Sequence, residues 1–150
     1  PDVMRIASRM LACGAKGYEL AEHLLERLSY SHILLLKRAL TTLSFESNRR
    51  LAWLQVTEED IRETGASSED MEGLVNYPRN IDGVEVGMLF KETGPETVKV
   101  SFRSNGNVDV AAFAKSIGGG GHVRAAGCTV HMPLQQAVPY VTDQLRRLLP

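Results

Sequence analysis

The stretch Gly118–Gly127, which reads G-G-G-G-H-V-R-A-A-G, decides how the C-terminal half of the sequence is interpreted. Four consecutive glycines are costly in conformational entropy and suit a loop that takes positive φ or admits another group closely. If a short helix begins near His122, its free N–H groups and those of the glycines would converge on an anion. The small side chains of Ala125 and Ala126 would let that helix lie close to a sheet. A plain flexible turn is the alternative, and His122 and Arg124 favour the functional interpretation over it.

Two segments before this stretch alternate as β-strands do. Val84–Phe90 and Val98–Arg103 place apolar residues at every second position, with a turn between the two segments. The second segment has a polar face made of Lys99, Ser101 and Arg103. For Lys99 the ordinary interpretation as a solvated strand residue is preferred.

Arg103 is the second candidate for anion binding. Its planar guanidinium, beside Ser104 at the end of the strand, can grip a phosphate with two hydrogen bonds, which a lysine cannot do. About 20 residues separate Arg103 from His122, and Asp109 is predicted to cap a short helix among them. That length allows a crossover that returns the glycine stretch to the same end of the strand.

The remaining pattern predicts a mixed sheet with flanking helices. The expected strands are 43–46, 51–56, 84–90, 98–103 and 128–131. Helices are expected to start at Thr57, to run from Ser67–Asp70 to Pro78, and to occupy 134–148, where Pro139 either kinks the last helix or begins it. The predicted class is α/β, in the α+β sense, with a sheet of about five strands preceded by a short helical segment.

The first 42 residues have a different character. Apolar residues recur at helical spacing over Val3–Leu11, Leu20–Leu28 and Ser31–Thr42, the last with Ser31 as its expected cap. Three short helices without a sheet would make a poor domain. We therefore expect residues 1–42 to be the end of a preceding domain and its connector, and residues 43–150 to be a separate domain. Because the chain opens at Pro1 inside a helical pattern, we expect it to be a piece of something longer.

Composition narrows the class of protein. The 150 residues are 43% hydrophobic, enough for a genuine core. Cys13 and Cys128 lie far apart and form no Cys-x-x-Cys motif, so nothing indicates a disulfide framework or a thiolate zinc site. A reducing, cytoplasmic setting is expected. The longest strongly apolar run, Ile33–Leu36, is far too short to span a membrane.

Charge is distributed unevenly along the chain. Residues 1–90 carry 10 Lys/Arg and 14 Asp/Glu, whereas residues 91–150 carry 7 and 4, so an anion should bind the second part. The net charge of −1 disfavours an indiscriminate polyanion binder and suits one or a few phosphates. The sequence shows no Asp/His cluster with metal-ligand spacing, no Ser-His-Asp arrangement and no P-loop. The expectation is a phosphate-binding surface without a reaction centre.

Taken together, several segments resemble the C-terminal substrate-binding domain associated with the DHH phosphoesterases. They are Val98–Ser104, Asp109–Val110, Gly119–His122 and Ala125–Gly127. Gly73–Pro78 and Gly83–Gly87 also resemble the bacterial oligoribonuclease and adenosine bisphosphate (pAp) phosphatase branch of that family. The resemblance covers roughly residues 45–149, and the preceding helices resemble the end of the DHH domain and its linker.

The resemblance implies that the two domains of such enzymes have different roles. In such enzymes the N-terminal domain holds two Mn(II) ions on Asp and His ligands, and a metal-activated water attacks the phosphorus in line. The C-terminal domain closes over the cleft and holds the nucleotide. This chain lacks the Asp-His-His motif and the metal ligands, so we expect it to bind no metal itself and to be inactive alone.

The resemblance also assigns roles to individual residues. Arg103 and Ser104 would bind substrate, and His122 would reach the phosphate near the metals, where it is also a candidate for assisting catalysis. Arg124 is a weaker candidate. The backbone groups that would cradle the substrate belong to Gly119, Gly120 and Gly121.

The expected partners are short RNA or nucleotide phosphates, a DHH domain in the same chain and a second copy in a homodimer, without a membrane. Cyclic dinucleotide phosphodiesterases and single-strand exonucleases share the C-terminal domain, and short RNA, pAp and cyclic dinucleotides stay open as substrates. Few aromatics and near-neutral charge disfavour a long single-strand track. A related domain ends alanyl-tRNA synthetases as a non-catalytic module for tRNA contact and self-association. His122 and the strand Ser101–Ser104 favour the phosphodiesterase interpretation.

Overall fold

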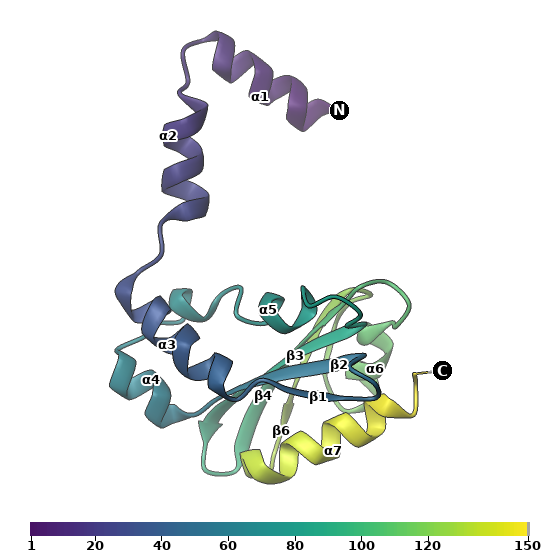
Figure 1. Ribbon diagram of the computed structural model, residues 1–150. Helices are drawn as coiled ribbons and strands as arrows, with labels where there is room; N and C mark the ends of the chain where they lie inside the picture. Colours follow the sequence, from purple (N-terminus) through teal and green to yellow (C-terminus); the bar gives the residue numbers. More distant parts are fainter. Residues whose placement is uncertain (150) are drawn as a thin grey trace.

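A computed structural model describes residues 1–149, apart from the side chains of Leu25 and Glu26. Among the described residues, six strands form one mixed sheet in the order β1-β2-β3-β4-β6-β5 (Figure 1). The strands are β1 (Ser44–Glu46), β2 (Leu51–Val56), β3 (Val86–Gly94), β4 (Thr97–Ser104), β5 (Gly120–His122) and β6 (Ala125–Val130). The mixed α/β class is confirmed, with one strand more than expected.

The main core lies on one face of the sheet. Strands β3 and β4 pair antiparallel, and the alternate residues on this face, such as Met88 and Phe102, are fully buried. They pack against α6 (Val110–Ser116) and α7 (Leu134–Arg146), where the rings of Phe102 and Phe113 meet edge to face at 5.4 Å. The predicted alternation of the two segments is therefore confirmed, and it fixes which residues of β4 point to the other face.

The opposite face is covered over only part of its width. α3 (Tyr30–Thr41), α4 (Glu58–Thr64), the 3₁₀ turn η2 (Glu69–Met71) and α5 (Asn76–Arg79) lie on the side of β2 and β3 (Figure 1). Leu35 of α3 packs there with Leu54, Leu74 and Leu89 in a second, smaller core. On β4, β6 and β5 the residues of this face, such as Lys99, remain exposed or half-buried. We call this part of the sheet the open face.

The helix expected near His122 is not formed. Residues 120–122 are instead the edge strand β5, which turns directly into β6. The backbone of the glycine run lies against β6 so closely that a Cβ at Gly119 would be 2.2 Å from the carbonyl oxygen of Gly127. Ala125 and Ala126 accordingly belong to a strand and not to a helix packed on the sheet.

Other predicted helix boundaries also change. Gly73 takes φ +83°, which breaks the helix expected up to Pro78, and Pro78 lies inside α5. Ser29, and not Ser31, caps α3 by accepting a hydrogen bond from the backbone N–H of His32. α7 begins at Leu134 and runs through Pro139, so the alternative in which the proline begins the helix is wrong.

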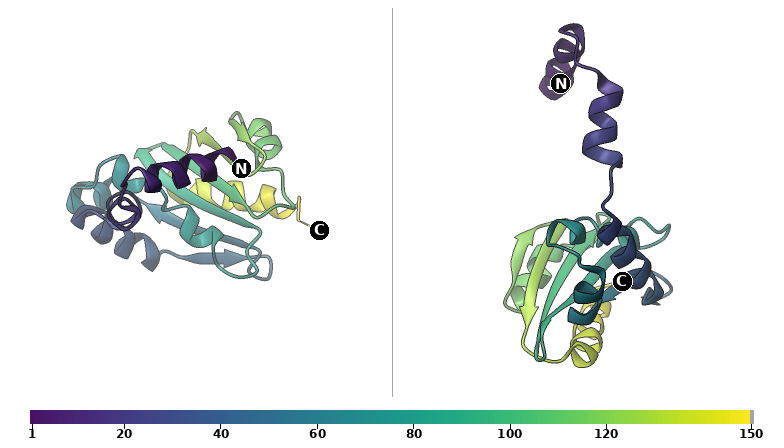
Figure 2. Two further views of the ribbon diagram at one scale, coloured as in Figure 1. Left: turned by 90° about the horizontal axis from the view of Figure 1, so that it is seen from above. Right: turned by 90° about the vertical axis from the view of Figure 1, so that its left-hand side faces the viewer.

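The N-terminal helices project away from the sheet. α1 (Asp2–Ala12), α2 (Gly17–Ala21) and the π-helical turn η1 (Glu22–Glu26) form an arm above it (Figures 1 and 2). Val3 on α1 is 78% exposed, and α1 has no buried residue. The domain division at residue 43 stays a prediction, although α3, before that point, packs on the sheet. Within residues 1–149 no helix is both long and apolar enough to cross a bilayer.

Carboxylates tie α3 to the segments that cover β2 and β3. Asp60 completes a capping box with Thr57 and accepts a hydrogen bond from Arg38 of α3 at 3.2 Å, and Asp70 accepts one from Ser29. Burial raises the pKa of Asp60, but the hydrogen bonds from Thr57 and Arg38 outweigh it, and the pKa lies below its usual 3.8. Ionised Asp60 therefore stabilises the fold.

We expect Asp60→Asn to flatten the acid limb of the stability profile. A lowered folded pKa gives stability that is present above about pH 4 and is lost as pH falls through the folded pKa. The variant should lose about 1 kcal/mol of unfolding free energy at neutral pH, because the capping-box acid is gone, and should fall less on acidification. Urea unfolding at neutral pH measures the loss of unfolding free energy, and the same experiment across the acid range measures its pH dependence. Asp82→Asn is the control at an exposed acid, and parallel acid limbs in wild type and Asp60→Asn would contradict the assignment.

Candidate phosphate-binding site

Strand register brings the two main candidates onto the open face. Arg103 of β4 lies opposite Ala125 of β6, and Ala125 lies opposite His122 of β5. Directly opposed residues share a face, so Arg103 and His122 flank a small alanine at a separation of two strand spacings, about 10 Å. The glycine stretch therefore returns to the same end of β4 as expected, but as a paired strand.

A second row of small residues lies beside the first. Ser101 of β4 is opposite Gly127, and Gly127 is opposite Gly120. A Cβ at Gly120 would meet nothing within 4 Å, so packing does not require a glycine there. Its absent side chain keeps the surface of β5 and β6 bare beside Ser101, and a ligand can come close to the backbone.

The local backbone structure explains the other glycines of the run. Gly118 and Gly119 close the end of α6, and the N–H of Gly119 donates to the carbonyl of Ala114 at 2.7 Å. Gly121 takes φ +144°, where a Cβ would lie 2.5 Å from the Cα of Ala126. The first turn of α6 lies beside Val123, but its N–H groups already donate to the carbonyl of Val123 and to the side chain of Asp109. Cradling of a ligand by the backbone of Gly119, Gly120 and Gly121 therefore stays a prediction.

Arg103 and Ser104 lie on different faces of the sheet. Arg103 is half-buried, and its Nη1 donates to the carbonyl of Phe102 at 2.9 Å, which fixes the guanidinium over the open face. Ser104 is buried on the core face, where its hydroxyl accepts a hydrogen bond from the N–H of Gly106 at 3.1 Å. Arg124 is exposed in the turn between β5 and β6, with its guanidinium beside Gly106. The structure thus groups Arg103 with His122 and leaves Ser104 apart.

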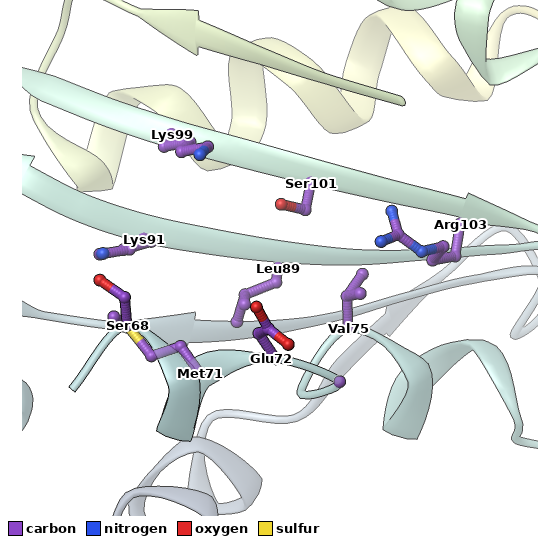
Figure 3. A pocket seen from close by; sticks show the side chains of 10 residues that line it. Ser68, Met71, Glu72, Val75, Leu89, Lys91, Lys99, Ser101 and Arg103 are labelled. Atoms are coloured by element: carbon purple, nitrogen blue, oxygen red, sulfur yellow. The ribbon is translucent and has the colours of Figure 1, made fainter. Parts of the chain in front are cut away.

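The open face continues from Arg103 into a cleft of about 510 Å³ (Figure 3). Strands β3 and β4 form its floor and the segment after α4 forms its wall. Its lining residues are Ser68, Met71, Glu72, Gly73, Val75, Leu89, Lys91, Lys99, Ser101 and Arg103. Three of them are basic and one is acidic, so the cleft favours anions.

The sequence pattern did not single out Lys91, and it assigned Lys99 only to solvent. The signal that could have found Lys99 was its place on the polar face with Arg103, which is confirmed. Lys91 has no such local signal. It reaches the cleft because β3 pairs with β4 and places Lys91 directly opposite Lys99.

Other chemistry is not supported by the described residues. Across residues 1–149, no group of three or more His, Cys, Asp or Glu side chains could hold a metal ion. Burial raises the pKa of the Cys128 thiol to about 11. The thiol is therefore protonated at neutral pH and does not serve as a nucleophile.

The chain is thus an α/β domain with a mixed sheet, one face covered by helices and the other partly open and lined by basic residues. Residues 48–149 match the DHHA1 domain model, and this chain belongs to that family. It is 35% identical over 150 residues to the bifunctional oligoribonuclease and PAP phosphatase NrnA of Thermus thermophilus, covering 99% of this chain and 44% of that protein. The NrnA of Mycoplasma pneumoniae is 39% identical over 56 residues, 37% of this chain and 17% of that protein. The chain thus spans less than half the length of these relatives.

Solved structures show the same fold. An exopolyphosphatase-related protein from Bacteroides fragilis has a TM-score of 0.86 at 24% identity, covering 97% of this chain and 43% of that one. The pGpG-specific phosphodiesterase PggH from Vibrio cholerae has a TM-score of 0.53 at 13% identity, covering 79% and 38%. The C-Ala domain of Aquifex aeolicus alanyl-tRNA synthetase has a TM-score of 0.50 at 16% identity, covering 66% and 89%. The family resemblance drawn from the sequence is confirmed.

Substitutions at two neighbouring glycines should distinguish a glycine that close packing requires from a glycine at an open position. We expect Gly121→Ala to lower the unfolding free energy by about 1–3 kcal/mol, because of its positive φ and the close Cα of Ala126. Gly120→Ala should be neutral or slightly stabilising, because its Cβ meets open space. Urea unfolding of the two variants provides the comparison, and an equal loss in both would show that Gly120 is not at an open position.

Proposed function

We propose that this chain is the substrate-binding half of a DHH-family phosphodiesterase and that it binds the phosphates of nucleotides or short RNA on the open face. The observation that carries the proposal is the row Arg103, Ala125 and His122 in a member of the DHHA1 family. The printed activities of its relatives, oligoribonuclease, PAP phosphatase and pGpG-specific phosphodiesterase, support a short nucleotide as the ligand.

The position of each residue in the proposed site supports a particular role in binding. One N–H of Arg103 is held by the carbonyl of Phe102, which leaves the remaining guanidinium donors for a phosphate with little loss of rotamer freedom. His122, exposed at the other end of the row, donates from its ring to the same or a neighbouring phosphate. Gly120 leaves room for the ribose. Ser104 positions the turn after β4 and does not touch the ligand.

The chemical step belongs to another domain in this proposal. A DHH domain holding two Mn(II) ions would precede residue 43 in the same chain, with residues 1–42 as its last helices and linker. The described residues of this chain offer no metal-ligand set, so no step of the reaction is assigned to them. The exposed apolar residues of the arm, such as Ile6 and Met10, fit packing against that preceding domain.

A non-catalytic tRNA-contact or dimerisation module is the competing class. The C-Ala domain shares the fold at 16% identity, and this likeness concerns the fold alone. Binding data separate the classes, because a phosphodiesterase half should recognise a free mononucleotide or dinucleotide at Arg103.

Titration of the 150-residue chain with pAp, followed by amide NMR, tests the binding site. We expect shifts at Ser101–Arg103 and at Gly120–His122, and at least tenfold weaker binding after Arg103→Ala, because charge-assisted bidentate hydrogen bonds are lost. Lys115→Ala, at an exposed lysine of α6, is the matched control and should leave binding unchanged. Absence of shifts at millimolar pAp would overturn the proposal.

Activity tests the division of labour between the two domains. With Mn(II) present, the chain alone should release no product from pAp or short RNA, whereas the same residues behind a DHH domain should hydrolyse at least one of these substrates. In the longer protein, Arg103→Ala should lower kcat/KM by about 100-fold. Hydrolysis by the chain alone, or unchanged kinetics in the Arg103 variant, would contradict the assignment.

A further inference from the structure

Two lysines stand directly opposite each other on the open face. Lys91 of β3 pairs with Lys99 of β4 at the end of the cleft farther from Arg103 (Figure 3). Like charges at directly opposed positions of an antiparallel pair are destabilising. The ion pairs formed among the described residues include neither lysine. Two adjacent cations therefore line the cleft and take part in none of these ion pairs.

The cleft has a cationic group at each end and a less polar middle. Arg103 lies at one end and the lysine pair at the other, with Ser101 and Leu89 between them (Figure 3). Lys99 and Arg103 are four residues apart on β4, which separates their Cα atoms by about 13 Å. Long side chains reaching inward shorten the gap between their charges. Val75 and Leu89, both largely buried, give the middle an apolar surface.

We propose that Lys91 and Lys99 bind a second phosphate of a ligand whose first phosphate is held at Arg103. This deepens the proposed function and rests on it. The ligand class is a short linear nucleotide with at least two phosphates separated by a nucleoside, whose ribose and base lie against Leu89 and Val75. A phosphate group between the two lysines offsets their repulsion, which explains why the pair is kept.

The pairing predicts how affinity depends on ligand length. A nucleotide with one phosphate fills one end of the cleft, whereas a 5′-phosphorylated dinucleotide reaches both ends. The second phosphate should therefore raise affinity about tenfold, the effect of one additional charge-assisted contact. The added contact should also steepen the salt dependence of binding, by about 0.7 in log K against log[salt] for each phosphate neutralised on a single strand.

The test compares 5′-AMP with 5′-phosphorylated diadenylate on the full 150-residue chain, by calorimetry and amide NMR. Wild type should prefer the dinucleotide by about tenfold. In the Lys91→Gln, Lys99→Gln double variant this ratio should fall toward one, and the steeper salt dependence of the dinucleotide should disappear. Lys115→Gln, at an exposed lysine of α6 on the core side of the sheet, removes a positive charge away from the cleft; it is the control and should keep the full ratio.

The unfolding temperature is a second measurement. If the lysines had a structural role, replacing either of them would lower it. Because the two lysines repel each other, each single Lys→Gln variant should unfold at the same temperature as wild type or higher. If AMP fails to shift Arg103, the proposed function fails. If AMP binds at Arg103 but wild type gains nothing from the second phosphate, or the double variant keeps the ratio, only the second-phosphate proposal is overturned.

Discussion

The close pairing of β6 between β4 and β5 is the constraint on which the open face depends. Gly121 and Gly119 lie so near the backbone of β6 that a side chain at either would collide with it. That contact sets the register in which His122 meets Ala125, and Ala125 in turn meets Arg103. The glycines are therefore needed for the close pairing of β5 with β6, and this strand register places the residues of the site.

The division of the sheet into two faces explains why binding groups gather on one side. α6 and α7 seal the core face, where Phe102, Val100 and Val98 are fully buried. Alternation along β4 then leaves Lys99, Ser101 and Arg103 on the other side, and α3 with its carboxylate contacts covers only the neighbouring strands. A partly covered sheet face supplies both a floor and a wall, which a fully covered or fully bare face would not.

Local patterns of the sequence predicted what depends on local spacing. Period-two alternation gave β3, β4 and the polar face with Arg103, and apolar spacing gave the helices. The short β5 was missed because three residues, two of them glycine, carry no alternation. Lys91 was missed because its partner is set by strand pairing between residues 91 and 99, which no periodicity within one strand reveals. Ser104 was grouped with Arg103 as its sequence neighbour, although adjacent strand residues point to opposite faces.

The charge distribution is best understood as an incomplete set of ion pairs. Some cations elsewhere in the described chain form ion pairs, as Arg38 does with Asp60 and Arg146 with Glu46, and others, such as Lys115, do not. A fold selected for stability alone would separate Lys91 from Lys99 or place an acid between them. Glu72 lines the same cleft but forms none of the ion pairs described. Because the net charge is only −1, the local excess of positive charge reflects placement and not overall composition. An anionic ligand bound in the cleft would neutralise this local excess of charge.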